Sequence, residues 1–103
     1  MDTVGFIDAG RLVLSEPFDD LHARFRRIEV TTDATVEPPS VPESWTGMNR
    51  AGRVVRLIDT RYREGETERR ATAVFSAARV DAYPMTLRDI FVAIVRERRK
   101  ARP

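Results

Sequence analysis

The clearest pattern of apolar residues in this sequence lies near its C-terminus. Apolar side chains recur there with the spacing of one helical face, at Leu87, Ile90, Phe91, Ile94 and Val95. This spacing predicts a helix from Leu87 to about Arg99. Thr86 is suited to cap its first turn, with Asp89 as a short-armed capping-box partner. We expect the apolar face to belong to the core first, and any part of it left exposed to be an interface.

Shorter patterns along the rest of the chain predict further strands and helices. The expected strands cover residues 4–8, 11–14, 28–32, 45–48, 53–59 and 79–83, with turns at 8–10 and 49–52. Apolar and polar residues alternate in several of these segments, which is typical of strands. One expected helix covers residues 17–26, and a second begins near Gly65 or Glu66 and keeps helical spacing as far as Ala78. Residues 33–44 contain three prolines and predict an extended loop.

This order of elements, β-β-α-β-β-β-α-β-α, predicts a single α+β domain over residues 1–103. A chain of 103 residues is long enough to bury one small core. Strands and helices interleave without a regular β-α-β series. That arrangement favours a mostly antiparallel sheet of short strands, with about three helices packed on one of its faces.

Composition and charge limit the kinds of site and the cellular compartment that we expect for this protein. The chain has no cysteine, which excludes disulfides and thiolate zinc sites. No apolar run reaches the roughly 20 residues that a membrane span needs, so we expect a cytoplasmic protein. Residues 1–48 hold 4 arginines against 9 acidic residues, a net charge of −5. Residues 49–103 hold 14 basic residues against 7 acidic ones, a net charge of +7.

The sequence contains no recognisable catalytic, cofactor-binding or metal-binding constellation. His22 is the single histidine, and Asp19, Asp20 and His22 do not share one helical face. The serines occur at positions 15, 40, 44 and 76, none of them in a nucleophile-elbow setting. The glycines occur singly, so neither a Walker A loop nor a G-x-G-x-x-G loop is present. We therefore predict that this chain is not an enzyme.

Two features leave a binding role open. Trp45 and Tyr62 can stack on a base or another ligand, although lone aromatic residues near strands more often belong to the core. The basic residues of the C-terminal half, including the run at 96–100, can contact phosphate. A small nucleic-acid-binding module is therefore the alternative hypothesis, and it predicts salt-sensitive binding to DNA or RNA. Because the arginines are scattered over several expected elements, a solvated surface is the simpler interpretation.

Two stretches carry a family resemblance. Residues 2–21 read DTVGFIDAGRLVL followed by SEPFDDL, and residues 84–95 read PMTLRDIFVAIV. The first stretch looks like the end of an ABC transporter ATPase domain, just after its switch histidine. The residues that fall on that pattern are Val4, Ile7, Gly10, Arg11, Val13, Pro17 and Leu21. The second stretch is similar to the segment that closes many export-type and multidrug-type ATP-binding subunits.

The resemblance implies a division of the chain and a set of partners. Residues 1–15 would be the terminal hairpin of the ATPase domain, and residues 16–103 an accessory C-terminal domain. The parent subunit would use ATP and magnesium to drive transport, at the cytoplasmic face of a membrane. Its nucleotide-binding motifs would lie upstream of Met1, so neither ATP nor magnesium is expected in this chain. The implied partners are the ATPase domain itself, the membrane subunit and a second copy of the chain in a homodimer, whereas nucleic acid is not expected.

Overall fold

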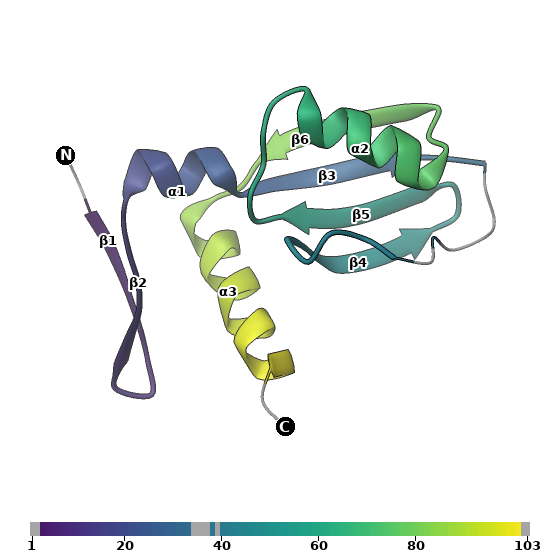
Figure 1. The fold of residues 1–103 in the computed structure, drawn as a ribbon. Helices are drawn as coiled ribbons and strands as arrows, with labels where there is room; N and C mark the ends of the chain where they lie inside the picture. The colour runs from purple at the N-terminus through teal and green to yellow at the C-terminus, as the bar shows by residue number, and fades with distance from the viewer. Residues whose placement is uncertain (1–2, 34–37, 39, 102–103) are drawn as a thin grey trace.

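The computed structural model describes residues 3–33, 38 and 40–101. Its elements follow one another in the predicted order (Figure 1). They are β1 (Thr3–Asp8), β2 (Arg11–Pro17), α1 (Phe18–Arg24), β3 (Arg26–Thr31), β4 (Trp45–Ala51), β5 (Val54–Asp59), α2 (Glu66–Phe75), β6 (Arg79–Pro84) and α3 (Leu87–Ala101). Within the described residues, three helices and two antiparallel sheets confirm the α+β class.

The strands form two separate sheets. β1 and β2 make a two-stranded hairpin, and the remaining strands form a four-stranded sheet in the order β4-β5-β3-β6. Every pairing in both sheets is antiparallel. The hairpin stands apart from the larger sheet, and α1 connects the two (Figure 1). Because an isolated two-stranded hairpin is only marginally stable in water, this one depends on packing against another element.

The larger core lies between α2 and one face of the four-stranded sheet. Residues paired across neighbouring strands, such as Ile28 with Leu57 and Val30 with Val55, place their side chains on this same face. The buried members of this core are Ile28, Val30, Trp45, Val55, Leu57, Ala71 and Phe75. Full burial of each large apolar side chain stabilises the fold by roughly 1.5–3 kcal/mol. This core fixes α2 against the sheet.

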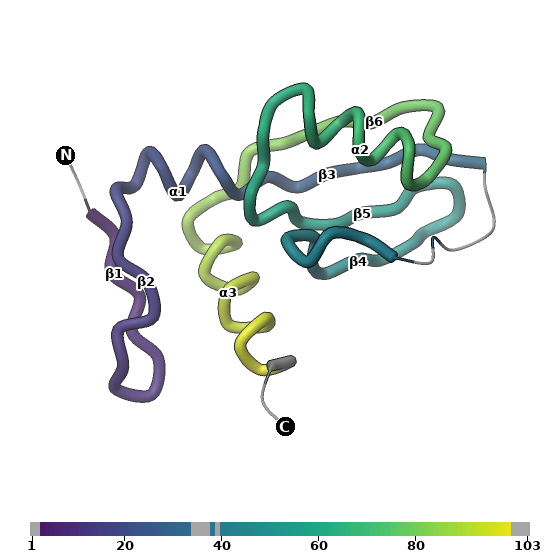
Figure 2. The backbone as a smooth tube through the Cα atoms, viewed as in Figure 1, coloured from purple at the N-terminus to yellow at the C-terminus, as the bar shows by residue number. Residues whose placement is uncertain are grey.

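The second core joins α1, α3 and the hairpin to the other face of the sheet. Its buried members are Leu21, Phe25, Met85, Ile90 and Ala93. Ile58 packs against this group, whereas its neighbour Leu57 belongs to the first core, as the alternation of side chains along a strand requires. The sequence predicted that all three helices would pack on one face of the sheet. This prediction is wrong, because α2 packs on one face and α1 and α3 on the side of the other. A tube through the backbone shows α3 running away from the sheet, on the same side of it as the hairpin (Figure 2).

Local backbone chemistry explains where several elements begin and end. The helix expected at 17–26 is shorter, because Phe25 is already extended, with φ −98° and ψ 116°, and leads into β3. The second hairpin turns at Gly52 and Arg53 and not over the whole of residues 49–52, since Asn49, Arg50 and Ala51 still pair with β5. Gly52 has a φ of +62°, which favours glycine at a tight turn. α2 ends before Ala78, because Ser76 adopts the left-handed conformation.

The start of α3 agrees with the predicted cap. The Thr86 hydroxyl accepts a hydrogen bond from the Asp89 backbone N–H at 3.1 Å, and the Thr86 carbonyl accepts one from the Ile90 N–H at 3.0 Å. Within the described chain, the Asp89 carboxylate makes no return bond to Thr86, because its side chain is one methylene shorter than that of glutamate. The expected loop at 33–44 lies partly outside the described residues, and after it the Trp45 N–H donates to the Pro42 carbonyl.

Candidate functional site

The apolar stripe of α3 mostly faces the inside of the molecule. Ile90 is fully buried in the second core, and Leu87 and Ile94 are partly buried against it. Phe91 and Val95 lie half-buried beside them. Val92, on the adjoining side of α3, is 42% exposed. The structure thus uses this stripe first as core, and the interface role predicted for its exposed part stays a prediction.

The hairpin covers the Phe91 side of α3. The rings of Phe6 in β1 and Phe91 have centroids 5.2 Å apart and are tilted by 37°, an arrangement typical of favourable aromatic pairs. An ion pair between Arg98 and Asp8, 3.0 Å long, joins the far end of α3 to the end of β1. Because Phe91 packs inside the chain, a charged residue there would detach the hairpin. Phe91 is therefore unsuitable as a probe of self-association.

The opposite face of the hairpin is apolar and open to solvent. Ile7 and Leu12 are partners across the two strands and are 69% and 65% exposed. Leu12 Cδ1 lies 3.8 Å from the position that a Cβ at Gly5 would take, so Leu12 spreads over the glycine and not toward α3. Strand alternation in β1, with Phe6 inward and Ile7 outward, is the signal from which the sequence could have identified this face.

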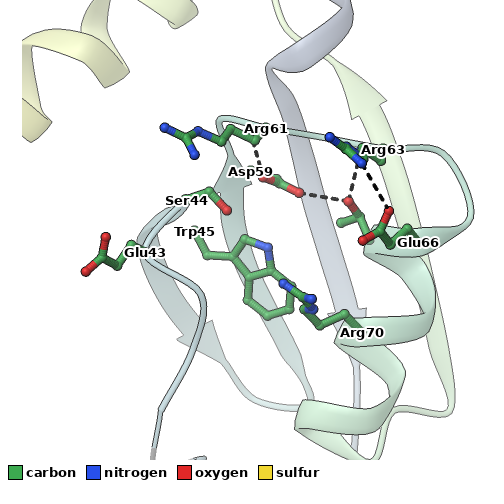
Figure 3. A pocket seen from close by; sticks show the side chains of 9 residues that line it. Glu43, Ser44, Trp45, Asp59, Arg61, Arg63, Glu66 and Arg70 are labelled. Atoms are coloured by element: carbon green, nitrogen blue, oxygen red, sulfur yellow. Dashed lines mark hydrogen bonds and ion pairs between the residues drawn. The ribbon is translucent and has the colours of Figure 1, made fainter.

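A cleft forms where the loop before β4, the end of β5 and the start of α2 meet. Its volume is about 380 Å³. The residues that line it are Glu43, Ser44, Trp45, Asp59, Arg61, Arg63, Glu66, Thr67 and Arg70 (Figure 3). They come from segments up to 27 positions apart in the sequence, between Glu43 and Arg70. No local motif connects these segments, so the sequence could not have predicted the cleft.

A buried carboxylate organises one wall of the cleft. Asp59 accepts hydrogen bonds from the Arg61 backbone N–H and from the Thr67 hydroxyl, both at 2.9 Å. The Thr67 hydroxyl in turn accepts one from the Arg63 backbone N–H at 3.1 Å. Both oxygens of Asp59 are thus used by donors of this chain. The network ties the β5–α2 loop to the first turn of α2.

Trp45 forms the floor of the cleft. Its indole stacks on Phe75 with ring centroids 6.1 Å apart and an interplanar angle of 9°. The side chain is only 7% exposed. Its N–H makes no hydrogen bond to any described residue and reaches solvent at the cleft, because no buried side-chain N or O atom of the described residues lacks a partner. The ring lies between Ser44 and Arg70, with its nitrogen on the edge turned toward Asp59 and α2 (Figure 3). Trp45 therefore belongs to the core and also presents an unused donor to the cleft.

Tyr62 lies beside the start of α2. Its hydroxyl donates a hydrogen bond of 2.7 Å to Glu68, and the second oxygen of Glu68 accepts from the Gly65 N–H. Burial raises the pKa of Tyr62 to about 12, and the hydrogen bond and negative charge of Glu68 add to this effect. Glu68 thus caps the start of α2 through the Gly65 N–H, and Tyr62 supports this cap only while its phenol is neutral and can donate a hydrogen bond.

Because of this raised pKa, the free energy of unfolding depends on pH in the alkaline range. The unfolded phenol loses its proton near pH 10, whereas the folded one keeps it to about pH 12. Between these values the unfolded state binds fewer protons, so stability falls as pH rises, by about 2 kcal/mol in total. Urea unfolding at pH 9 to 12 should show this fall, and Tyr62→Phe should reduce it. Tyr83→Phe, at an exposed position, is the control. An unchanged slope in Tyr62→Phe would refute the assignment.

Other candidate residues lie away from the cleft. The His22 ring stacks on Phe18 with centroids 5.6 Å apart, which assigns it a packing contact on α1. Among residues 3–33, 38 and 40–101, no group of three or more histidine, cysteine, aspartate or glutamate side chains is placed to hold a metal ion. In the same part of the chain, no helix has the length and apolar character needed to cross a membrane.

Comparison with known proteins adds no family to the description of this chain, which therefore depends on its fold and its surfaces. A scan against protein-family models, a search of curated proteins and a search of solved structures each gave no match. The chain is thus a small α+β domain with an exposed apolar hairpin face and a cleft lined by three arginines and three acidic residues.

Proposed function

We propose that the chain is a non-catalytic interaction domain, the C-terminal accessory domain of an ABC transporter ATP-binding subunit. In that role it would lie at the cytoplasmic face of a membrane, where the parent subunit couples ATP hydrolysis to transport. It would stabilise the ATPase domain, support pairing of two subunits or tune their activity. The ATPase domain, the membrane subunit and a second copy of the chain are the proposed partners.

The observation that carries this proposal is the two-faced hairpin β1–β2. Its inner face docks on α3 through Phe6, and its outer face exposes Ile7 and Leu12. An apolar cross-strand pair this exposed is a feature of interaction surfaces. The same hairpin carries the resemblance to the end of an ATPase domain. We therefore assign its outer face to contact with the rest of that domain.

The alternative, a nucleic-acid-binding module, receives less support from the charges. On the face of the four-stranded sheet opposite α2, two of the arginines are already paired with acidic residues. Arg56 pairs with Glu29 at 3.0 Å, and Arg79 pairs with Asp81 at 2.8 Å. A phosphate backbone would have to compete with these carboxylates for each guanidinium.

The first test is the genomic reading frame upstream of the codon for Met1. The proposal requires an in-frame Walker A motif, a signature sequence and a switch histidine there. A stop codon close upstream, with no such motifs, would refute it. This result does not depend on any property of the folded chain.

The second test replaces both exposed residues, as Ile7→Ser with Leu12→Ser. In the 103-residue chain the change in stability should stay within about 0.5 kcal/mol, because both side chains already face solvent. In the parent subunit the same pair should cost about 2 kcal/mol or more, because it would be buried there. Thermal unfolding of both proteins makes the comparison.

The matched control for this pair is Met48→Ser, at another exposed apolar position on a different hairpin. Met48→Ser should be neutral in both proteins. If the double variant lost as much stability in the 103-residue chain as in the parent, the outer face of the hairpin would already be covered within this chain. If the double variant changed the stability of neither protein, the ATPase domain would not cover this face.

A further inference from the structure

The solvent side of α3 is a basic face that the folded chain does not neutralise. Its exposed residues recur every three or four positions and so share one side of the helix, and they are Arg88, Val92, Arg96 and Arg99. We call this side the arginine face. None of its three arginines forms an ion pair with a described residue, whereas Arg98, on another side of α3, pairs with Asp8.

Two hollows lined by apolar side chains adjoin the arginine face. The first, of about 300 Å³, lies where α3 meets the sheet, and its apolar lining consists of Ile58, Pro84, Met85, Val92 and Ala93. The second, of about 250 Å³, has an apolar lining of Phe91, Val92 and Val95. Val92 borders both hollows, so they lie next to each other along the helix.

The charges around the two hollows favour an acidic partner. The charged residues that line them are Arg27, Arg96, Arg99 and Asp89. Arg27 lies 5.6 Å from the ring centroid of Tyr83 and forms no ion pair with a described residue. Together with Arg88, four positive charges and one negative charge give this surface a net charge of +3. The cleft at Trp45 differs, because its acidic and basic residues are equal in number.

We propose that the arginine face of α3 binds an acidic amphipathic helix of a protein partner. A helix laid along α3 would place apolar side chains in the two hollows, on either side of Val92, and carboxylates against the arginines. Helices pair in this way in coiled coils, where apolar residues meet at the centre and opposite charges flank them. A nucleic acid would satisfy the arginines but not the apolar hollows, and a membrane surface is too flat to enter both hollows.

A second copy of the chain does not supply this helix. Its exposed acidic residues Asp19 and Asp20 lie on α1, whose apolar side chain Leu21 is already fully buried. The proposal is also independent of the transporter role, because that role uses the outer face of β1 and β2. Ile7→Ser with Leu12→Ser should therefore leave binding at α3 unchanged, whatever its effect in the parent subunit.

A labelled peptide measures the binding by fluorescence anisotropy. The probe is a helix of about 15 residues, with leucine along one face and glutamate elsewhere. We expect a dissociation constant on the order of 10 μM, which weakens as salt screens the charges. Arg96→Glu with Arg99→Glu should weaken binding about tenfold or more, because both replacements put like charges opposite the probe.

The matched control is Arg69→Glu with Arg70→Glu, which makes the same change of net charge at exposed positions of α2. It should leave the affinity within about twofold at physiological salt. Equal weakening by both pairs would overturn the proposal, because binding would then depend on net charge alone. A preserved amide spectrum of each variant shows that the fold is intact.

The probe itself separates the other occupants. A peptide with glutamine in place of leucine, and one with lysine in place of glutamate, should both fail to bind. Equal affinity for either would overturn the proposal, as would no saturable binding of the leucine–glutamate peptide. Tighter binding of duplex DNA, or of phosphatidylglycerol–phosphatidylcholine vesicles, through the same arginines would also overturn it. Self-association that is lost in Arg96→Glu with Arg99→Glu, seen by sedimentation, would assign the face to a second copy instead.

Discussion

Replacing Ile90 with alanine is expected to lower the free energy of unfolding by about 3 kcal/mol, one of the two largest effects that we predict for this fold. Ile90 is fully buried on α3, among side chains from α1 and the segment before α3. Truncation removes apolar contact area and leaves a cavity that the surrounding side chains fill only in part. Chemical denaturation, followed through the single tryptophan, measures the change.

Val92→Ala is the matched control for Ile90→Ala, because both lie on α3 and lose a branched side chain. Val92 is largely exposed, so its truncation should change stability by no more than about 0.5 kcal/mol. Alanine is also the better helix former, which offsets part of any loss. Equal losses at both positions would contradict the orientation of α3. A loss below about 1 kcal/mol at Ile90 would contradict its burial.

The order of elements could be predicted because each one carries a local signal. The 3.6-residue spacing from Leu87 onward predicts α3, and the Thr86 cap predicts where it begins. Alternation and β-branched residues predict the strands. These signals depend on neighbours a few positions away, and tertiary packing did not override them. The α+β class follows from them.

The distribution of the helices could not be predicted from the same signals. Amphipathic spacing shows that a helix buries one face, but not which surface covers that face. In the fold, α2 packs on one face of the four-stranded sheet, while α3 packs with α1 and the hairpin. Ile58 and Leu57 are adjacent in β5 and serve different cores. That division depends on pairing between distant strands, which spacing along the chain does not encode.

The two candidate surfaces differ in the same way. The exposed face of the hairpin could be found by alternation, since Ile7 follows an inward-facing Phe6. The cleft could not, because Trp45, Asp59 and Arg70 line one cavity only after α2 docks on the sheet. Tryptophan near a strand start is typical of a core residue, and Trp45 is one. Its unused N–H becomes visible only when the fold shows which groups surround it.

Replacing Asp59 with alanine is expected to cost about 2–3 kcal/mol of stability. The buried carboxylate is the acceptor for the Arg61 N–H and the Thr67 hydroxyl, and its removal leaves these donors unpaired. The β5–α2 loop would then lose its attachment to the first turn of α2. Asp59→Asn keeps one carbonyl oxygen as an acceptor and a similar volume, so it should cost less than the alanine variant.

Glu43→Ala is the control for Asp59→Ala, because it removes an exposed carboxylate from the same cleft. It should leave the free energy of unfolding within about 0.5 kcal/mol of the wild-type value. Urea unfolding of the three variants, read through Trp45, ranks them directly. Equal values for Glu43→Ala and Asp59→Ala would show that the buried network does not hold the loop. The expected ranking would instead show that one carboxylate sets the shape of the cleft, since the loop it fixes carries two of the arginines that line it, Arg61 and Arg63.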